Sequence, residues 1–193
     1  MLMHFDMTGS LVYFKSPDEE LPHSRLLFAF ENGYHLAFDC QRMFGKVDLV
    51  EDRGEFMREK ELGPDPLDVD ADSFLERFEG RKGGVKAALT NQKVLAGLGN
   101  TYSDEILFQA QLHPRASVAH LDDPSLGKLH TEVRRVLKMA IEWEANLHKL
   151  PDSFLLSHRR EGERCPRGNG KIRKIKVAGR TAYYCPACHP KAR

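Results

Sequence analysis

The sequence of 193 residues has no long apolar run and no overall excess of either charge. No apolar stretch reaches the roughly 18 residues that a membrane-spanning helix needs, so we expect no membrane contact. The segment Met1–Met7 lacks the basic start and the cleavage pattern of a signal peptide, and we therefore expect a cytoplasmic protein. The formal net charge of +1 gives no indication of a polyanion partner by itself. The hydrophobic fraction of 41% is enough for a folded core.

Cysteine is also scarce, with only Cys40, Cys165, Cys185 and Cys188 in the chain. Cys185 and Cys188 form a Cys-x-x-Cys pair. In a cytoplasmic protein such a pair favours metal binding or redox chemistry over structural disulfides.

The charges are unevenly distributed along the chain. From His158 to Arg193 there are eleven Lys/Arg and two Asp/Glu, whereas the preceding residues hold 18 basic and 26 acidic side chains. A basic tail on an acidic body is typical of proteins that bind a polyanion. The alternative is a solvated, disordered tail, but this tail also contains aromatic, β-branched and cysteine residues, which favour a folded element.

The pattern of the chain changes near residue 62. Residues 8–50 contain strand-like runs, and Asn32-Gly33 predicts a two-residue hairpin turn between the second and the third. Leu62-Gly63-Pro64-Asp65-Pro66-Leu67 disfavours a helix and marks a domain boundary. The predicted strands are Leu11–Phe14, Arg25–Glu31, Tyr34–Phe38 and Lys46–Val50, with a short helix or ordered loop at Arg53–Leu62.

Beyond the boundary the pattern is helical and then returns to β-structure. Apolar residues recur at helical spacing over Pro124–Leu147, which predicts a long amphipathic helix. The last predicted element is a hairpin with its tip at Ala178-Gly179-Arg180. The other predicted elements are helices at Asp72–Phe78, Gly84–Thr90 and Asn100–Gln111, and strands at Lys171–Val177 and Thr181–Tyr184.

The most informative segment is the glycine-containing turn of Asn91–Glu105. Gly97 and Gly99 permit positive φ and the close approach of a ligand to the backbone. We expect Asn100 to cap the following helix, whose free N–H groups attract anions. With Lys93 just upstream, this arrangement predicts contact with a phosphate.

The segment Lys93–Tyr102, continued to His113-Pro114, resembles the helix–two-turns–helix motif of the formamidopyrimidine-DNA glycosylase / endonuclease VIII family. Other segments agree with the family in the same order, and the resemblance covers nearly the whole chain. They are Met7-Thr8-Gly9-Ser10-Leu11 with the Met-Ser/Thr-Gly strand, Arg42-Met43-Phe44-Gly45 with the Arg-Arg-Phe-Gly loop, Leu62–Leu67 with the interdomain linker, and Cys165 to Cys188 with the C-terminal zinc finger.

The resemblance implies an α+β fold in three parts. We expect a partial N-terminal β-sandwich at 1–62, a helical domain with the helix–two-turns–helix at 63–157, and a zinc-finger-like β-hairpin at 158–193. The implied activity is that of a bifunctional DNA glycosylase and AP lyase, which removes oxidised bases in base excision repair. The implied partner is damaged double-stranded DNA, and we expect a monomer.

The family's catalytic proline and the glutamate that follows it are absent from the start of this sequence. The chain thus resembles an N-terminally truncated or divergent member, its catalytic residues cannot be assigned, and we expect impaired chemistry. The alternative is a non-catalytic module that binds damaged DNA, and a third is an RNA-binding zinc ribbon. No segment between Pro151 and Arg164 matches a base-recognition loop, so the sequence does not predict which lesion is preferred.

The family's DNA-binding positions are better preserved. Met7, Arg42 and Phe44 match residues that fill the gap left by a flipped nucleotide, although Met7 and Phe44 would also suit an ordinary core. By the same resemblance Lys93 and Asn100 bind phosphates and Arg180, at the fingertip, grips the backbone around the lesion.

The expected zinc finger is incomplete. The family pattern has two Cys-x-x-Cys pairs, but here Gly168 stands where the second cysteine belongs, which leaves Cys165, Cys185 and Cys188 as Zn²⁺ ligands. A structural zinc is normally held by four ligands. The alternative is a hairpin that keeps the shape of the finger without metal, through packing of its apolar side chains.

Overall fold

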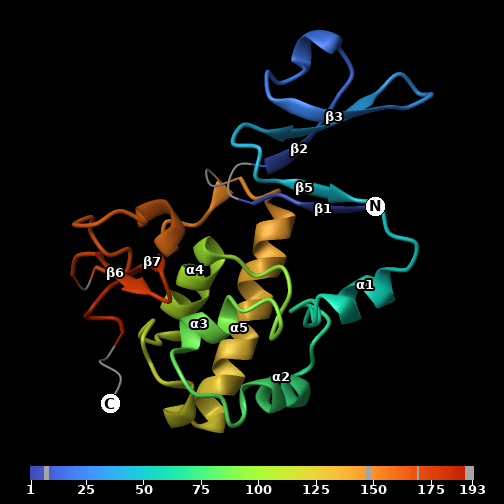
Figure 1. Cartoon of the computed structure of the whole chain (residues 1–193). Coiled ribbons are helices and arrows are strands. Elements are labelled where there is room, and N and C mark those ends of the chain that lie inside the picture. Colours follow the sequence, from blue (N-terminus) through green and yellow to red (C-terminus); the bar gives the residue numbers. More distant parts are fainter. Residues whose placement is uncertain (7–8, 147–148, 169, 190–193) are drawn as a thin grey trace. The chain divides into compact units, whose positions relative to one another are not determined.

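A computed structural model describes residues 1–6, 9–146, 149–168 and 170–189 (Figure 1). The chain divides into two compact units, Met1–Phe56 and Met57–Arg193. The division lies earlier than the boundary expected at residue 62 and falls within helix α1 (Arg53–Glu59). Small antiparallel sheets and helices together give the expected mixed fold.

The first unit consists of short antiparallel strands. Strand β4 is central in a three-stranded sheet of order β2-β4-β3, and β1 pairs with β5 in a second sheet. The predicted strands are all present, with ends shifted by at most two residues. The elements of this unit are β1 (Leu2–His4), β2 (Gly9–Phe14), the 3-10 helix η1 (Pro17–Glu19), β3 (Ser24–Ala29), β4 (His35–Cys40) and β5 (Lys46–Asp48).

The hairpin between β3 and β4 is present, but its turn is longer than predicted. Gly33 N–H donates to Phe30 O at 2.9 Å, and Phe30 N–H donates to Tyr34 O at 2.8 Å. Of the two predicted turn residues only Gly33 has positive φ, at +79°. A two-residue type I′ turn needs positive φ at both positions. The loop therefore has three residues, and Gly33 takes its left-handed position.

The second unit is mainly helical. Helix α5 ends at Glu142, before the predicted end, because Glu144 and Ala145 adopt positive φ and turn the chain. The predicted end, Leu147, lies outside the described residues. The further elements are α2 (Ala71–Phe78), α3 (Val85–Leu89), α4 (Asn100–Ala110), η2 (Val118–His120), α5 (Asp123–Glu142), η4 (Leu155–His158), β6 (Arg173–Val177) and β7 (Arg180–Tyr184).

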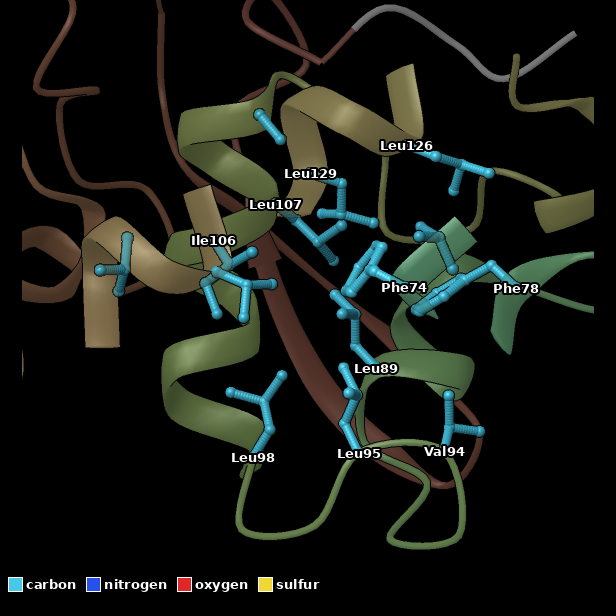
Figure 2. Packing of buried hydrophobic residues seen from close by; sticks show 14 of the residues in the cluster. Phe74, Phe78, Leu89, Val94, Leu95, Leu98, Ile106, Leu107, Leu126 and Leu129 are labelled. Atoms are coloured by element: carbon cyan, nitrogen blue, oxygen red, sulfur yellow. The ribbon is translucent and has the colours of Figure 1, made fainter. Parts of the chain in front are cut away.

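The main hydrophobic core of the second unit lies between these helices. Figure 2 shows side chains from α2, α3, α4 and α5 pointing toward one another, together with Val94, Leu95 and Leu98 from the turn before α4. Because these three are fully buried, the turn is anchored by its own apolar side chains. Within the described ranges no helix is both long and apolar enough to cross a membrane.

The proline-containing segment after residue 62 is fixed against the same turn. Gly63 N–H donates to Gln92 O at 2.8 Å, and Ala96 N–H donates to Pro64 O at 2.9 Å. A Cβ atom at Gly63 would lie 2.6 Å from Val94 O. Only glycine permits this close approach of two backbones.

Candidate nucleic-acid interface

The turn between α3 and α4 is held in shape by one side chain that the sequence did not single out, Gln92. Its Nε2 donates to Leu98 O at 3.1 Å and to Thr90 O at 3.3 Å, and its Oε1 accepts from Gly97 N–H at 2.8 Å. Gly97 has φ +86°, as its glycine predicts. The amide of Gln92 thus satisfies backbone groups on both sides of the turn.

The expectation that Asn100 caps helix α4 is wrong. Gly99 is the N-cap residue and makes no side-chain cap, and Asn100 is the first residue of the helix. The Asn100 side chain instead donates from Nδ2 to Thr181 O at 3.1 Å. The helix terminus is therefore joined to the C-terminal hairpin.

Arg180 is the first residue of β7. The tip of the hairpin is the two-residue turn Ala178-Gly179, with φ +46° and +76°, and Val177 pairs with Arg180 across it. Positive φ at both turn residues matches the twist of a β-hairpin. One guanidinium N–H of Arg180 points at Thr90 O, with Nη1 3.4 Å from that oxygen.

The structure therefore brings two of the predicted site residues together. Asn100 is bonded to the carbonyl of Thr181, the neighbour of Arg180, and Arg180 reaches back to the end of α3. The glycine-containing turn and the fingertip share one hydrogen-bonded cluster. Strand β7 packs against α4, so this is a close contact between elements and not one isolated bond.

Lys93 lies in the same turn and is exposed. Its ammonium forms a salt bridge with the Glu61 carboxylate, and this hydrogen bond and its charge hold the Glu61 pKa below its usual value. Because both side chains are largely exposed, the pair is weak and leaves Lys93 able to exchange partners.

The cations of the hairpin lie on both of its faces. The register places Lys174 and Lys176 on one face and Arg173 and Arg180 on the other, because directly paired residues point the same way. Lys174 pairs with Glu161 at 2.8 Å. Positive charge therefore surrounds the hairpin.

Next to this cluster lies a group of buried charged residues that the sequence did not predict. Lys86 Nζ pairs with Asp104 Oδ1, and both side chains are about fully buried, at 1% and 0% exposure. Arg159 donates from Nε to Asp104 Oδ2 at 2.9 Å. Burial lowers the pKa of Lys86 and raises the pKa of Asp104, and their mutual attraction opposes both shifts.

Glu105 is the second buried acid on α4. Its carboxylate accepts from Leu156 N–H at 2.8 Å and from Gln109 Nε2 at 2.6 Å. Burial raises its pKa to about 7. The side chain therefore holds the start of η4.

The predicted metal ligands come together in the hairpin region. The sulfurs of Cys165, Cys185 and Cys188 all lie within 4.8 Å of one another, and all three residues are buried. Ile172 and Leu155 pack around them in a second apolar cluster. His189 is not part of this group, and its Nδ1 lies 2.8 Å from Cys185 O.

In the first unit the structure places Arg42 and Phe44 beside each other, and the Arg42 guanidinium lies 5.1 Å from the centre of the Phe44 ring. Phe44 is 58% exposed, so it is not a core residue of this unit. Met43 between them has φ +57°. Met7, the third predicted gap-filling residue, lies outside the described residues.

Comparison with known proteins gives the same family for both parts of the chain. Residues 1–47 match the formamidopyrimidine-DNA glycosylase N-terminal domain, and residues 62–151 match the formamidopyrimidine-DNA glycosylase H2TH domain. Formamidopyrimidine-DNA glycosylase of Chloroflexus aurantiacus is 32% identical over 97% of this chain and 72% of its own length. The protein of that name from Symbiobacterium thermophilum is 36% identical, over 98% of this chain and 67% of its own.

Solved structures agree with the sequence comparison. The Lactococcus lactis formamidopyrimidine-DNA glycosylase non-covalently bound to DNA with an AP site has a TM-score of 0.82 and 29% identity. This match covers 98% of this chain and 74% of the other. The complex of that enzyme with FAPY-dG-containing DNA has a TM-score of 0.83. The chain therefore belongs to the formamidopyrimidine-DNA glycosylase family.

Proposed function

We propose that this protein recognises oxidised-base or abasic lesions in duplex DNA, as part of base excision repair by DNA glycosylase and AP lyase chemistry. Its relatives are named as DNA glycosylases, and the structures of solved relatives contain DNA with an AP site or FAPY-dG. A DNA substrate in a bacterial-type cell implies a cytoplasmic location, and we expect binding as a monomer.

The observation that carries this proposal is the cluster formed by Asn100 and Arg180 around Thr181. A helix terminus offers free backbone N–H groups to an anion, and an arginine offers a planar fork that matches a phosphate. Since both belong to one hydrogen-bonded group, they can contact neighbouring phosphates of one DNA backbone. Phosphate contacts of this kind position a protein on DNA without reading its sequence.

Recognition of the lesion is assigned to the first unit, whose two sheets we take as part of the family's β-sandwich. Exposed Phe44 and the adjacent Arg42 suit the gap that a flipped nucleotide leaves. Unstacking a base costs a few kcal/mol and least at a damaged pair, so an inserted ring and an arginine offset part of that cost.

We further propose that Cys165, Cys185 and Cys188 hold a zinc ion. A Zn–S bond of about 2.3 Å places neighbouring thiolates about 3.8 Å apart, and Cys165 Sγ lies 3.5 Å from Cys188 Sγ. Burial raises the pKa of the Cys165 thiol to about 12, and a bound divalent ion would favour its thiolate form. Bound zinc would cross-link the two ends of the finger.

Binding is tested with a fluorescent duplex that carries one tetrahydrofuran abasic analogue. We expect tighter binding to this duplex than to the undamaged duplex and to a structured RNA of equal length. Equal affinity for damaged and undamaged DNA would refute lesion recognition. A preference for the RNA would support the RNA-binding alternative.

Chemistry is tested by borohydride trapping on a natural abasic site. An amine that attacks the sugar C1′ releases water and forms a Schiff base, and hydride from borohydride reduces the C=N bond to a stable amine. A covalent adduct identifies lyase-type chemistry in this chain. Selective binding without an adduct identifies a non-catalytic binder of damaged DNA.

A further inference from the structure

Lys86 and Asp104 form the most deeply buried ion pair among the described residues of the second unit. Three elements meet there, because Lys86 belongs to α3, Asp104 to α4, and Arg159 follows η4. Both oxygens of the Asp104 carboxylate are engaged, Oδ1 by Lys86 and Oδ2 by Arg159.

Stability is a weak explanation for such a group. Transfer of two charges out of water is costly, and well-packed apolar residues of the same volume often replace a buried ion pair without loss of stability. Buried charged groups instead fix the position and orientation of their partners, because each N–H needs an acceptor at a specific place. The acceptors therefore indicate what the group positions.

Two members of the group contact strand β7 of the finger. Lys86 Nζ donates to Thr181 O at 3.3 Å, the same oxygen that accepts from Asn100 Nδ2 at 3.1 Å. The Arg159 guanidinium lies 4.8 Å from the centre of the Tyr183 ring. Both contacts fall within three residues of Arg180.

We infer that Lys86, Asp104 and Arg159 are positioning residues that hold β7 against α4, so that Arg180 and Asn100 meet the DNA backbone in a fixed relation. Lys86 touches no DNA in this arrangement, because its side chain is buried. This inference rests on the proposed function, since it concerns how the same interface is built.

The test is a double-mutant cycle with Lys86→Met and Arg180→Ala, measured as affinity for the abasic-analogue duplex over a series of salt concentrations. Methionine keeps the length of the side chain, and Asp104 keeps Arg159 as its partner. We expect Lys86→Met to weaken binding by about tenfold, the size of a typical coupling between interacting residues. The slope of log affinity against log salt should fall by no more than it does in Arg180→Ala, because the phosphate contact that Lys86 positions is that of Arg180.

The cycle itself decides whether Lys86 acts through the fingertip. If it does, the double variant binds no more weakly than Arg180→Ala alone. Additive losses, or a salt slope reduced more by Lys86→Met than by Arg180→Ala, would overturn the inference. If Arg180→Ala alone leaves affinity and salt slope unchanged, the proposed DNA interface is refuted. This result differs from additive losses, which refute only the positioning role of Lys86.

Two further variants separate positioning from stability. Lys86→Met/Asp104→Leu removes both charges, so it should regain thermal stability over Lys86→Met but still bind weakly. Recovery of full binding would mean that Lys86→Met acts only by destabilising the fold, and would contradict a positioning role. The matched control is Lys128→Met. Lys128 is an exposed lysine on α5 that donates to Gln111, so this variant should change neither thermal stability nor DNA binding.

Discussion

Glu105 carries a carboxyl group inside the protein, where an ionised carboxylate loses its hydration. We predict that the protein loses stability as pH rises from about 4.5 to about 7, and that this loss levels off at higher pH. Below about pH 4.5 the group is protonated in the folded and the unfolded chain, so it costs nothing. Between about pH 4.5 and 7 the unfolded chain releases this proton while the folded chain, with a pKa of about 7, keeps it, so the loss grows to about 3 kcal/mol and then stays constant.

The measurement is the free energy of unfolding from pH 4.5 to pH 8 for the wild type and Glu105→Gln. Subtracting the two curves removes contributions from other titrating groups. The difference should grow in favour of the variant as pH rises from 4.5 to about 7 and then stay constant up to pH 8. Parallel curves would show that Glu105 titrates at its ordinary value.

Arg180 gives the second prediction at this scale. Arg180→Ala should weaken DNA binding and lower the salt slope by about 1, because one phosphate contact is lost. Arg180→Lys keeps the charge but loses the planar fork, so it should keep the slope and lose part of the affinity. Electrophoretic or fluorescence titrations between 50 and 200 mM salt give both quantities. An unchanged slope in the alanine variant would contradict the assigned role.

Residues whose role depends only on the local backbone were predicted from the sequence, whereas residues that contact distant parts of the chain were not. Gly97 shows positive φ as predicted, since a glycine between two helical patterns states a backbone requirement. The partner of Asn100 could not be predicted, because Thr181 is distant in sequence and only tertiary packing brings them together. Lys86 and Asp104 were missed for the same reason, since nothing in their spacing distinguishes them from surface charges.

Among the elements, the segment after residue 62 is hydrogen-bonded to the turn before α4 and packs closely against it. We predict that Gly63→Ala destabilises the protein by about 1–3 kcal/mol, because the new methyl group would overlap the Val94 carbonyl. Gly127→Ala is the matched control. It lies within α5 with nothing within 4 Å of an added Cβ, so it should stabilise by up to about 1 kcal/mol. Thermal melts of both variants measure the two opposite changes in stability. An unchanged melting temperature for Gly63→Ala would show that the turn before α4 can move away from the added methyl group.

The finger gives a second prediction among the elements. The purified protein should contain about one zinc per chain, and a strong chelator should lower its melting temperature. Cobalt substitution should produce sulfur-to-metal charge-transfer absorption, which Cys185→Ser should reduce. Cys40→Ser is the control, since Cys40 lies in the first unit, apart from the cluster. A metal-free protein with an unaltered melt after chelation would favour the metal-free hairpin.

The existence of elements was easier to predict than their ends. Helix α5 was predicted from apolar periodicity, but periodicity says nothing of the positive φ at Glu144 and Ala145 that ends it. The hairpin turn at Asn32-Gly33 was expected to have two residues, and the register of β3 with β4 imposed three. In a hairpin the loop length and the strand register depend on each other, so a two-residue turn signal alone does not fix either one.

For the whole molecule, the two units differ in how much core they contain. Both large apolar clusters consist of residues beyond Met57, whereas the first unit buries few apolar side chains. We predict that residues 57–193 fold alone, with a cooperative melt, and bind duplex DNA. The fragment should lose most of its preference for the abasic duplex, because Arg42 and Phe44 are absent. Full retention of that preference would move lesion recognition into the second unit.

The family was predictable at this scale because its signature segments occur in one order along the chain, and the comparisons confirm it. The division at Phe56 was not, because the prolines after residue 62 mark a rigid segment that belongs to the helical unit. A helix-breaking sequence shows where helices end and does not show which neighbour the segment packs on.

The sharing of Thr181 O by Lys86 and Asn100 has a consequence for protein engineering. Residues 158–193 are not a transplantable module. Grafted onto another scaffold, the finger would leave behind the lysine and the amide that aim it, and its arginine would sample many orientations. Swapping fingers between relatives should succeed only when α3 and the first turn of α4 are exchanged together with them.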